Sequence, residues 1–468
     1  MKSCTKKYTL LFSLFLFSTL VLNAAKLDKY PPHPEYDEEA VVARLEAIDE
    51  NIVEFRNHSV VRSYIKSYVH YRPEKAERII GRAVTYLPLF EEYLAKHNMP
   101  DELKYLAIVE SALVPRAVSK VGALGLWQFM PGTAREQGLT INRYIDERCD
   151  PHKSTEAALS YLRQLYDRYH DWELALAAYN SGPGRVNRAI RRGRSKDFWR
   201  IRRYLPRETR NYVPAFIAAA YLMKYYHLHD LQPRYPNLDL QLTSSTKVYH
   251  HFSFYRIAQV TGISLDVVKA LNPSYTNDFI PANSEGNYLI LPSRAMLAFE
   301  DYLQNHMPIN TNEYPELSAP VSASKTVEEI NAAYFASYYQ VQEGETLEDI
   351  AKAFNYTIHH LLAWNDLSAK TLQPGQRLVI YHPKEIKRFQ FREDLELISM
   401  IPSIPVRALE GIPIPHFQTD YLRYTVSRKE KPSEIARKTG VELSELLSTN
   451  NLRANKTLKP GTSLRLNK

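Results

Sequence analysis

The sequence predicts a multidomain protein in which an all-α domain is followed by three small α+β modules. Three observations lead to this prediction. The chain has 468 residues, which is more than one hydrophobic core usually serves. Residues 74–229 show helical periodicity with almost no strand-like alternation. Beyond Pro233, short apolar strands alternate with short helices, and this pattern repeats along the chain.

The first residues have the layout of a secretory signal. Three lysines within the first seven residues precede the apolar residues 8–22, and small residues follow up to Ala25. We therefore predict a signal peptide at 1–25 and export to the periplasm or cell envelope of a bacterium. An uncleaved N-terminal anchor is the alternative. Cys4 precedes the apolar stretch, so a lipid anchor there is disfavoured, and Cys149 would be left without a disulfide partner in the mature chain.

The all-α part begins with residues 26–73, which we expect to form a linker and a helical hairpin over 38–69. Longer helical runs follow, at residues 76–96, 155–169, 174–179 and 208–226. Pro100 and Asp101 are expected to start a further helix that carries Glu110, with Asp101 as a cap or first-turn acid.

Glu110 is a lone acid in an apolar stretch. On a continuous helix, Leu106, Ala107, Leu113 and Val114 would all lie on its own face. Burial of that kind favours the protonated carboxyl, which is how an acid is kept available near neutral pH. The alternative is a structural Glu that is satisfied by a salt bridge or by backbone N–H groups.

An internal repeat supports the modular part of the prediction. The strongest pair aligns Val341 with Val426, so that equivalent residues are 85 apart. At this offset Asn365 falls on Asn450, and the Pro-Gly turns before the two last strands match after a one-residue insertion. A weaker upstream copy begins near Val248. Each copy is expected to run strand, helix, helix, strand over about 45 residues.

These modules resemble LysM domains, most specifically in the second copy, which reads Gly-Glu-Thr-Leu at 344–347. The resemblance implies binding of glycans that contain N-acetylglucosamine, in a groove near Gly344, Thr346 and Asn365. We predict a divergent LysM-like module at 245–293 and LysM modules at 338–382 and 421–467, with linkers at 294–337 and 383–420. A purely structural repeat, or a protein contact, is the alternative.

Three further segments of the all-α part are hard to explain by packing alone. Residues 119–131 contain Gly122 and Gly125, which permit a tight turn and a close approach of the backbone to a ligand. Residues 178–186 contain Ala-Tyr-Asn, and residues 208–213 read Glu-Thr-Arg-Asn-Tyr-Val. With Glu110-Ser111, these segments resemble the soluble lytic transglycosylase domain, which has a lysozyme-like helical fold. The match covers 89–229, and we predict the domain at 74–232.

Joined to LysM copies, the domain resembles the membrane-bound lytic murein transglycosylase D type. The resemblance implies a carbon-oxygen lyase that cleaves the β-1,4 bond between N-acetylmuramic acid and N-acetylglucosamine and leaves a 1,6-anhydro sugar. It implies that Glu110 is the catalytic acid. It also implies the substrate-binding residues, which are Ser119, Gln128, Met130, Tyr179, Asn180, Glu208 and Tyr212.

The residue chemistry agrees with a single catalytic acid. An ordinary glycosidase needs two carboxylates, and Glu208 is the one rival near the motifs. The same resemblance implies that Glu208 is part of the hydrogen-bonded wall of the site, which leaves Glu110 to act first as acid and then as base. A second catalytic role for Glu208 is the alternative. A lysozyme-like hydrolase on the same fold is the second hypothesis. A non-enzymatic wall-binding scaffold is the third.

Composition and charge set the expected partners. There are 60 Lys and Arg against 52 Asp and Glu, a net charge of +8 that favours anionic partners such as cell-wall polymers or a phospholipid surface. We expect peptidoglycan glycan strands as the partner of a monomer, and we leave association with the envelope membrane open. The arginine-rich residues 185–203 are interpreted as a solvated helix face, because no nucleic-acid-binding motif accompanies them. The adjacent histidines at 250–251 and 359–360 lack metal-ligand spacing, so neither a metal nor a cofactor is expected.

Overall fold

The computed structural model describes residues 36–48, 52–53, 58–305, 330, 332–367, 371–384, 386, 422–426, 429–439, 441–450, 452–453, 457–460 and 462–466. The predicted signal peptide lies outside the described residues, as do residues 306–329 and 387–420, the greater part of the two predicted linkers. None of the helices within the described ranges is long and apolar enough to cross a membrane.

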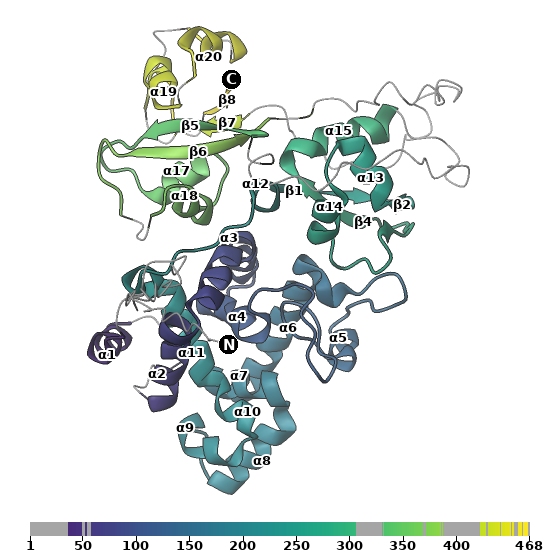
Figure 1. Cartoon of the computed structure of the whole chain (residues 1–468), viewed down its shortest axis with the longest axis vertical. Coiled ribbons are helices and arrows are strands. Elements are labelled where there is room, and N and C mark those ends of the chain that lie inside the picture. Colours follow the sequence, from purple (N-terminus) through teal and green to yellow (C-terminus); the bar gives the residue numbers. More distant parts are fainter. Residues whose placement is uncertain are drawn as a thin grey trace, which may run out of the picture.

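The first part of the chain is a helical domain that occupies the lower half of Figure 1. Its long helices are α3 (Pro73–Lys96), α6 (Pro151–Tyr169), α7 (Trp172–Ser181), α8 (Pro183–Gly193) and α11 (Tyr212–Tyr225). Its shorter elements are α1 (Glu38–Glu46), α2 (Ser59–Lys66), η1 (Ser67–Tyr71), η2 (Asp101–Tyr105), α4 (Leu106–Ser111), α5 (Pro131–Glu136), η3 (Glu147–Cys149), α9 (Phe198–Ile201), η4 (Arg202–Tyr204), α10 (Arg207–Arg210) and η5 (Tyr226–His229). The segments between α4 and α5 contain only isolated bridges among the described residues. The expectation of an all-α domain is therefore confirmed.

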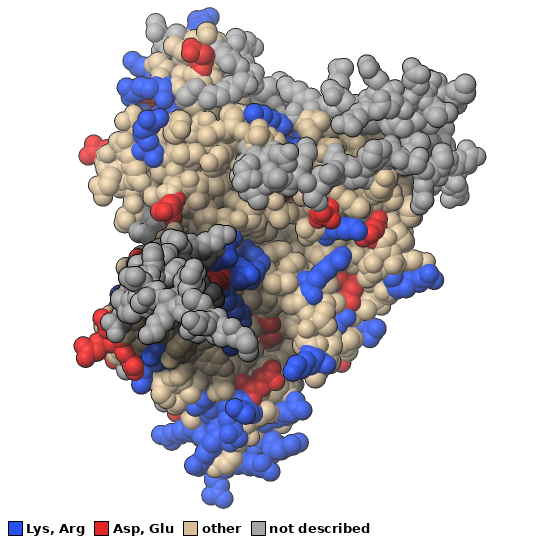
Figure 2. Space-filling view, viewed as in Figure 1, with Lys and Arg blue, Asp and Glu red and all other residues tan. Residues whose placement is uncertain are grey.

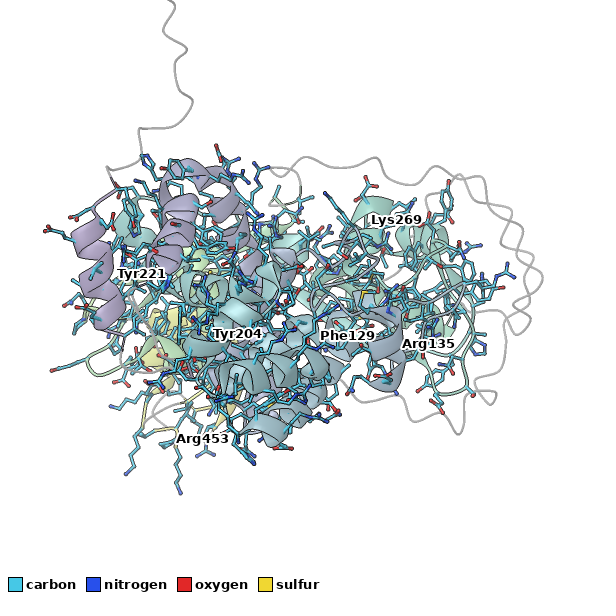
Figure 3. The ribbon with its side chains drawn as sticks, turned by 90° about the horizontal axis from the view of Figure 1, so that it is seen from below. Phe129, Arg135, Tyr204, Tyr221, Lys269 and Arg453 are labelled. Carbon is cyan, nitrogen blue, oxygen red and sulfur yellow. The ribbon has the colours of Figure 1, made fainter. Side chains whose placement is uncertain are left out.

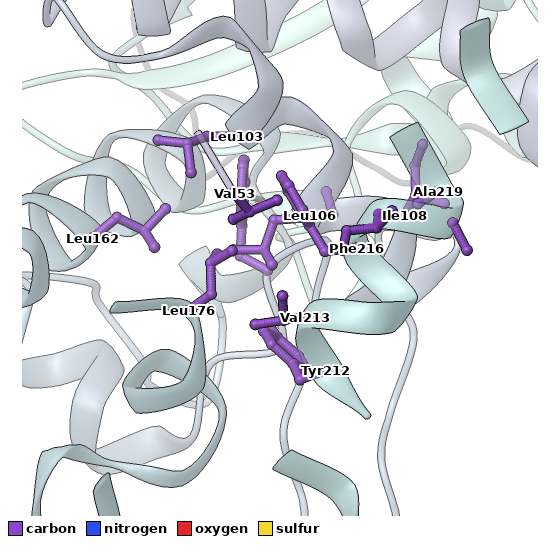
Figure 4. Close-up of a cluster of buried hydrophobic side chains, with 14 of the residues drawn as sticks. Val53, Leu103, Leu106, Ile108, Leu162, Leu176, Tyr212, Val213, Phe216 and Ala219 are labelled. Carbon is purple, nitrogen blue, oxygen red and sulfur yellow. The ribbon is translucent and has the colours of Figure 1, made fainter. Parts of the chain in front are cut away.

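The N-terminal helices share the core of this domain. Val61 and Ile65 of α2 are fully buried in the same cluster as Phe216 of α11. Figure 4 shows how Leu106 of α4 and Val213 of α11 meet at the centre of this cluster. The predicted boundary at residue 74 therefore cuts through one core, and the described residues between 36 and 73 belong to the helical domain.

Helix α4 is shorter than the spacing around Glu110 suggested. Ala112 adopts a left-handed conformation, with φ of 52°, and Leu113 follows with φ of 60°. Arg82 Nε donates to the Ala112 carbonyl oxygen at 2.9 Å and so fixes the end of the helix. Leu113 is buried, but Val114 is 36% exposed. The expectation that both residues lie on the helical face of Glu110 was wrong, because the helix ends at Ser111.

A second break falls inside the predicted helix 208–226. The chain forms α10, interrupts at Asn211 and then continues as α11. Asp101 does lie in the first turn of η2, where its carboxylate accepts a hydrogen bond from Lys104 Nζ at 2.5 Å. The prediction of a first-turn acid is confirmed.

The first module follows helix α12 (Leu238–Gln241) and pairs its first strand with its last. Strand β1 (Thr243–Val248) runs antiparallel to β4 (Asn287–Pro292), with Thr243 opposite Pro292. Helices α13 (Phe254–Thr261) and α14 (Leu265–Leu271) lie between them in sequence. The short strands β2 (Phe252–Ser253) and β3 (Phe279–Ile280) flank the two helices and pair antiparallel with each other. This is the strand, helix, helix, strand order that the repeat predicted.

The predicted linker from residue 294 was wrong in its first part. Residues 293–305 form helix α15 (Ser293–Asn305), and Ala295, Met296, Phe299 and Tyr302 are buried in the core of the first module. Their spacing of three and four residues is that of an amphipathic helix. The module is therefore larger than 245–293.

The second and third modules repeat the pairing of first and last strands. The second has β5 (Tyr334–Gln340), α17 (Leu347–Ala353), α18 (Ile358–Trp364) and β6 (Arg377–Pro383), with β5 and β6 antiparallel. The third has β7 (Leu422–Thr425), α19 (Pro432–Thr439), α20 (Leu443–Thr449) and β8 (Ser463–Leu466), with β7 and β8 antiparallel. The two modules bury one common hydrophobic cluster.

A charged network lies at the contact between these two modules. Tyr339 donates to Glu345 at 2.8 Å in the second module, and Tyr424 donates to Glu430 at 3.1 Å in the third. Lys438 serves both carboxylates, at 3.4 Å from Glu345 and 2.5 Å from Glu430. All three charged groups are buried, which suits a cation placed between two anions.

The modules also contact the helical domain. Arg116 donates to the carbonyl oxygens of Pro273 and Tyr275 of the first module, each at 2.9 Å. His359 of the second module lies 2.9 Å from Glu91 of α3. Figure 3 shows Lys269 of the first module on the same side of the molecule as Phe129 and Arg135, and Tyr221 on the opposite side.

Candidate active site

A cleft of about 930 Å³ opens in the helical domain. Eight residues that the sequence analysis assigned to the site line it together: Glu110, Ser119, Gln128, Met130, Tyr179, Asn180, Glu208 and Tyr212. They come from α4, the glycine turn at 119–130, α7, α10 and α11, which are far apart in sequence. The fold therefore brings the three motif segments and Glu110 to one place.

Glu110 stands at the last turn of α4, where its carboxyl is half-buried. Burial raises the pKa of Glu110 to about 7, against the lowering effect of a hydrogen bond from Tyr212, and the nearby charge of Glu208 raises it further. The Tyr212 hydroxyl donates to Glu110 Oε1. At neutral pH a substantial fraction of this carboxyl therefore carries a proton, as a general acid requires.

Two tyrosines flank the acid, and both keep their protons. Burial raises the pKa of Tyr179 and of Tyr212 well above the ordinary tyrosine value, and the charge of Glu110 adds to the effect in each case. Tyr179 donates to the Trp127 carbonyl oxygen at 2.9 Å. Both hydroxyls are therefore neutral donors, and Tyr179 links α7 to the glycine turn.

Arg148 stabilises the glycine turn by hydrogen bonds to its backbone. Its guanidinium pairs with Asp146 and donates to the carbonyl oxygens of Gly122 and Phe129, at 3.0 and 3.2 Å. Gly125 has φ of +93°, and a Cβ there would lie 1.8 Å from the Arg148 carbonyl oxygen. Only glycine fits this position. From the sequence we expected a close approach of the backbone to a ligand, whereas Gly125 approaches the backbone of Arg148.

Ser119 and Gln128 have structural partners as well as a place in the cleft. Ser119 Oγ accepts from Ala123 N at 2.9 Å, and Gln128 Nε2 donates to the carbonyl oxygens of Ala117 and Gly125. These bonds leave the Ser119 hydroxyl proton and the Gln128 carbonyl oxygen for other partners. Asn180 Oδ1 accepts from Thr209 at 2.8 Å and so ties α7 to α10.

Of three residues near Glu110, one is exposed at the cleft and two are buried in the domain. Met130 is 43% exposed and lines the cleft. Trp127 is completely buried, donates to Thr155 at 3.0 Å and packs on Phe90, so it anchors the glycine turn. Ser111 is buried, and its hydroxyl lies within hydrogen-bond distance of the Ala107 and Leu126 carbonyl oxygens, so it makes a hydrogen bond inside the core.

The sequence analysis missed part of the cleft. Tyr64, Ser67 and Tyr68, from the helices before residue 73, also line it, as do Arg72 and Asn211. Tyr64 and Tyr68 are four residues apart, so they share one helical face. The spacing of these two tyrosines was the available signal. It was not used, because residues 26–73 were interpreted as a linker and a helical hairpin that precede the catalytic domain.

The predicted groove residues of the second module are not among the residues that line this cleft. Gly344 has φ of +79° with open space around it, and Thr346 caps α17 through Asp349. The Asn365 amide is occupied by backbone groups, because it donates to the Leu361 and Val379 carbonyl oxygens and accepts from Val379 N. Its role in sugar binding stays a prediction.

The remaining titratable candidates have contacts of their own. His360 stacks on Trp364, and His251 packs on Phe279. Cys149 is free and buried, and burial raises the pKa of its thiol to about 12, which keeps it unreactive. Within the described ranges no three His, Cys, Asp or Glu side chains are grouped closely enough to hold a metal ion.

Comparison with known families agrees with this geometry. The family described as "Transglycosylase SLT domain" matches residues 88–202, which contain Glu110 and the glycine turn. The LysM domain family matches residues 339–380 and 424–467. The family described as "Lytic transglycosylase MltD, LysM-like domain" matches residues 243–306, which include α15.

Individual relatives extend the comparison. Membrane-bound lytic murein transglycosylase D of Escherichia coli K12 is 30% identical over 407 residues, which cover 86% of this chain and 78% of the relative. The soluble lytic murein transglycosylase of the same organism is 36% identical over 109 residues, covering 22% of this chain and 17% of the relative. A crystal structure of the 70 kDa soluble lytic transglycosylase of Escherichia coli matches with 30% identity and a TM-score of 0.28, covering 31% and 25% of the two chains.

The helical fold, the cleft and these relatives together define an enzyme of the lytic transglycosylase class. Within that class the modular organisation and the long similarity decide the family. The chain belongs to the membrane-bound lytic murein transglycosylase D family.

Proposed function

We propose that this protein cleaves the β-1,4 bond between N-acetylmuramic acid and N-acetylglucosamine in peptidoglycan, without water, and leaves 1,6-anhydromuramic acid ends. The observation that carries the proposal is the cleft carboxyl of Glu110, whose pKa burial raises to about 7 and whose Oε1 accepts from Tyr212. Among the described residues that line the cleft, Glu208 is the only other carboxylate.

Glu110 acts first as an acid. Tyr212 occupies Oε1, so the proton is carried on the other oxygen, Oε2, and passes from there to the glycosidic oxygen as the bond to C1 breaks. The 2-acetamido group of the muramic acid stabilises the cationic carbon. No protein nucleophile is required for this step.

Glu110 then acts as a base. Its carboxylate accepts the proton of the muramic acid C6 hydroxyl while that oxygen forms a bond to C1, which returns Glu110 to the protonated form. The Tyr212 hydroxyl donates in both states, and its bond strengthens when the carboxylate forms. A residue whose pKa lies near the working pH can therefore donate one proton to the leaving oxygen and accept another from the C6 hydroxyl.

The remaining residues of the cleft bind and orient the sugars. Ser119 offers its hydroxyl proton and Gln128 its carbonyl oxygen, because their other groups already have partners. The exposed thioether of Met130 packs on a pyranose face. Tyr179 and Asn180 form the wall that α7 contributes. Hydrogen bonds to the backbone fix Ser119, Gln128 and Tyr179. The cleft can therefore hold the C6 hydroxyl near C1 in place of water.

Hydrolysis is the second candidate, since Glu208 lines the same cleft. It is disfavoured because Glu208 is exposed and lies four residues before Tyr212, on the wall that already bonds Glu110. A hydrolase of this kind needs its second carboxylate across the sugar from the acid. Glu208 instead contributes charge that raises the pKa of Glu110.

We also propose that three modules hold the glycan near the cleft, with residues 243–305 as the first and the matched LysM segments as the others. Several weak sites on one chain raise the effective concentration of a polymer. Export to the periplasm or cell envelope follows from the leader-like residues 1–25 and the wall substrate.

Mass spectrometry of muropeptides released from purified sacculi tests the reaction. Anhydro ends are expected, whereas a hydrolase would give reducing ends heavier by one water. Glu110→Gln keeps the shape of the side chain and should abolish release. A scaffold function would be indicated if Glu110→Gln and the unmutated chain released equal amounts, or if neither released any.

A further inference from the structure

A second hollow lies beside the cleft, and the proposed reaction does not use it. Its volume is about 390 Å³, and it is lined by Trp199, Arg202, Arg203, Arg207, Arg210 and Asn211. We call it the arginine pocket. Figure 2 shows Lys and Arg side chains gathered at the lower end of the molecule, where Figure 1 places α8 and α9.

Local chain geometry points these arginines to one place. Helix α9 and η4 supply Trp199, Arg202 and Arg203, and after the turn at Leu205 the chain returns as α10 with Arg207 and Arg210. On α10 the side chains divide: Glu208 lines the cleft and Thr209 is buried, whereas the two arginines line the pocket. The motif segment 208–213 therefore builds both sites.

The four arginines are not neutralised. Arg202 is held by the Arg210 carbonyl oxygen and by Asn211 Oδ1, at 2.5 and 3.0 Å, and Arg210 by the Leu205 carbonyl oxygen at 2.8 Å. None of the four forms an ion pair with a described carboxylate. Two acids of this region have partners, since Asp197 lies 3.6 Å from Arg200 and Glu173 accepts from Trp199. Glu208, which stands between Arg207 and Arg210 on α10, lines the cleft.

The cations are crowded as well as unpaired. Burial and the charge of Arg210 both lower the pKa of Arg202. Neutral oxygens orient two of the four, Arg202 and Arg210. The remaining N–H donors around the hollow can bind an anion. A carboxylate is the best match, because a guanidinium can bond both of its oxygens at once.

We propose that the arginine pocket binds the carboxylate groups of the peptide that is attached to muramic acid in peptidoglycan. This inference rests on the proposed function. Asn211 lines both the cleft and the pocket, so an anion on a short branch of the bound glycan reaches the arginines. The hollow is small, and Trp199 is the one apolar side chain among the described residues that line it. It therefore suits a small acidic branch better than a lipid membrane, which would need a broad apolar surface.

The test compares glycan strands that carry uncrosslinked peptides with the same strands after an amidase has removed them. The variant R203Q/R207Q removes two exposed arginines, for which the structure gives no hydrogen bond. The matched control R191Q/R192Q removes two exposed arginines of α8 that lie outside the pocket. The measured quantity is the KM on peptide-bearing strands divided by the KM on peptide-free strands.

The ratio is expected to rise about fivefold in the pocket variant, as the loss of two exposed charge contacts implies, and to stay unchanged in the control. An unchanged ratio in the pocket variant, or an equal rise in the control, would overturn the inference. It would also be overturned if the pocket variant lost binding to phosphatidylglycerol vesicles while its KM ratio stayed the same. If the unmutated chain cut neither strand, the proposed function itself would fail.

Discussion

The Tyr212 hydroxyl donates a hydrogen bond to Glu110 Oε1 across 102 residues of sequence. The bond joins the first residue of α11 to the last turn of α4, whose apolar faces pack together in the core. It opposes the burial that raises the pKa of Glu110. The two effects together keep the pKa of the carboxyl near 7, so that at neutral pH it can both donate and accept a proton.

Removal of this bond should move the pH profile. Tyr212→Phe eliminates a donor that favours the carboxylate, so the pKa of Glu110 should rise by roughly one unit and kcat should fall. Activity that depends on protonated Glu110 is lost as pH rises through that pKa. The basic limb of kcat/KM should therefore move to higher pH. A basic limb that stays in place would contradict the assignment of Glu110 as the acid.

The burial of Glu110 should also be visible in stability. Its pKa is raised from 4.5 to about 7 in the folded state, so the folded protein binds the proton more tightly and loses stability as pH rises between these values. The glutamine of Glu110→Gln cannot ionise. At pH 8 the free energy of unfolding of this variant should therefore be about 1–3 kcal/mol higher than that of the unmutated chain. Urea unfolding measures this difference. The two chains should differ little at pH 4, which is the internal control.

The glycine turn should tolerate substitution at one glycine and not at the other. In Gly125→Ala the new Cβ would lie 1.8 Å from the Arg148 carbonyl oxygen, so the turn must shift. We expect a loss of roughly 3 kcal/mol or more and a loss of activity. Gly122 has a similar φ of +87° with nothing within 4 Å, and Gly122→Ala should lose only about 1 kcal/mol. Equal effects in denaturant unfolding would exclude contact with Arg148 as the cause.

The contact between the second and third modules should depend on Lys438. In Lys438→Met the carboxylates of Glu345 and Glu430 remain buried without their common cation, which destabilises such a site by about 3–5 kcal/mol. Calorimetry of the full chain should show an earlier unfolding transition for these modules. Lys459→Met, at an exposed position of the third module, is the matched control and should leave that transition in place.

Much of this organisation could be predicted because the signals are local. Helical periodicity marked α3, α6 and α7, and the repeat marked paired strands around two helices in each copy. The family resemblance of the motif segments implied eight residues that line one cleft. These features depend on residues close in sequence, so a single chain reveals them.

The errors share a physical origin in long-range contacts. Nothing near Ala112 marks the end of α4, which is fixed by a hydrogen bond from Arg82, thirty residues away. Helix α15 was taken for linker although its apolar residues recur at helical spacing, because the core they enter is formed by residues far upstream. The contribution of Tyr64 and Tyr68 to the cleft likewise depends on how α2 packs against α11.

The lysine between the second and third modules has a consequence for which copies can pair. Tyr339 and Glu345 correspond in the repeat to Tyr424 and Glu430, but the position equivalent to Lys438 is Ala353. A pair of second modules would therefore enclose two carboxylates and no cation, whereas the third module brings a positive charge to share. The second and third modules are therefore complementary in charge. The second module pairs with the third module of its own chain, which supplies Lys438, in preference to another copy of itself.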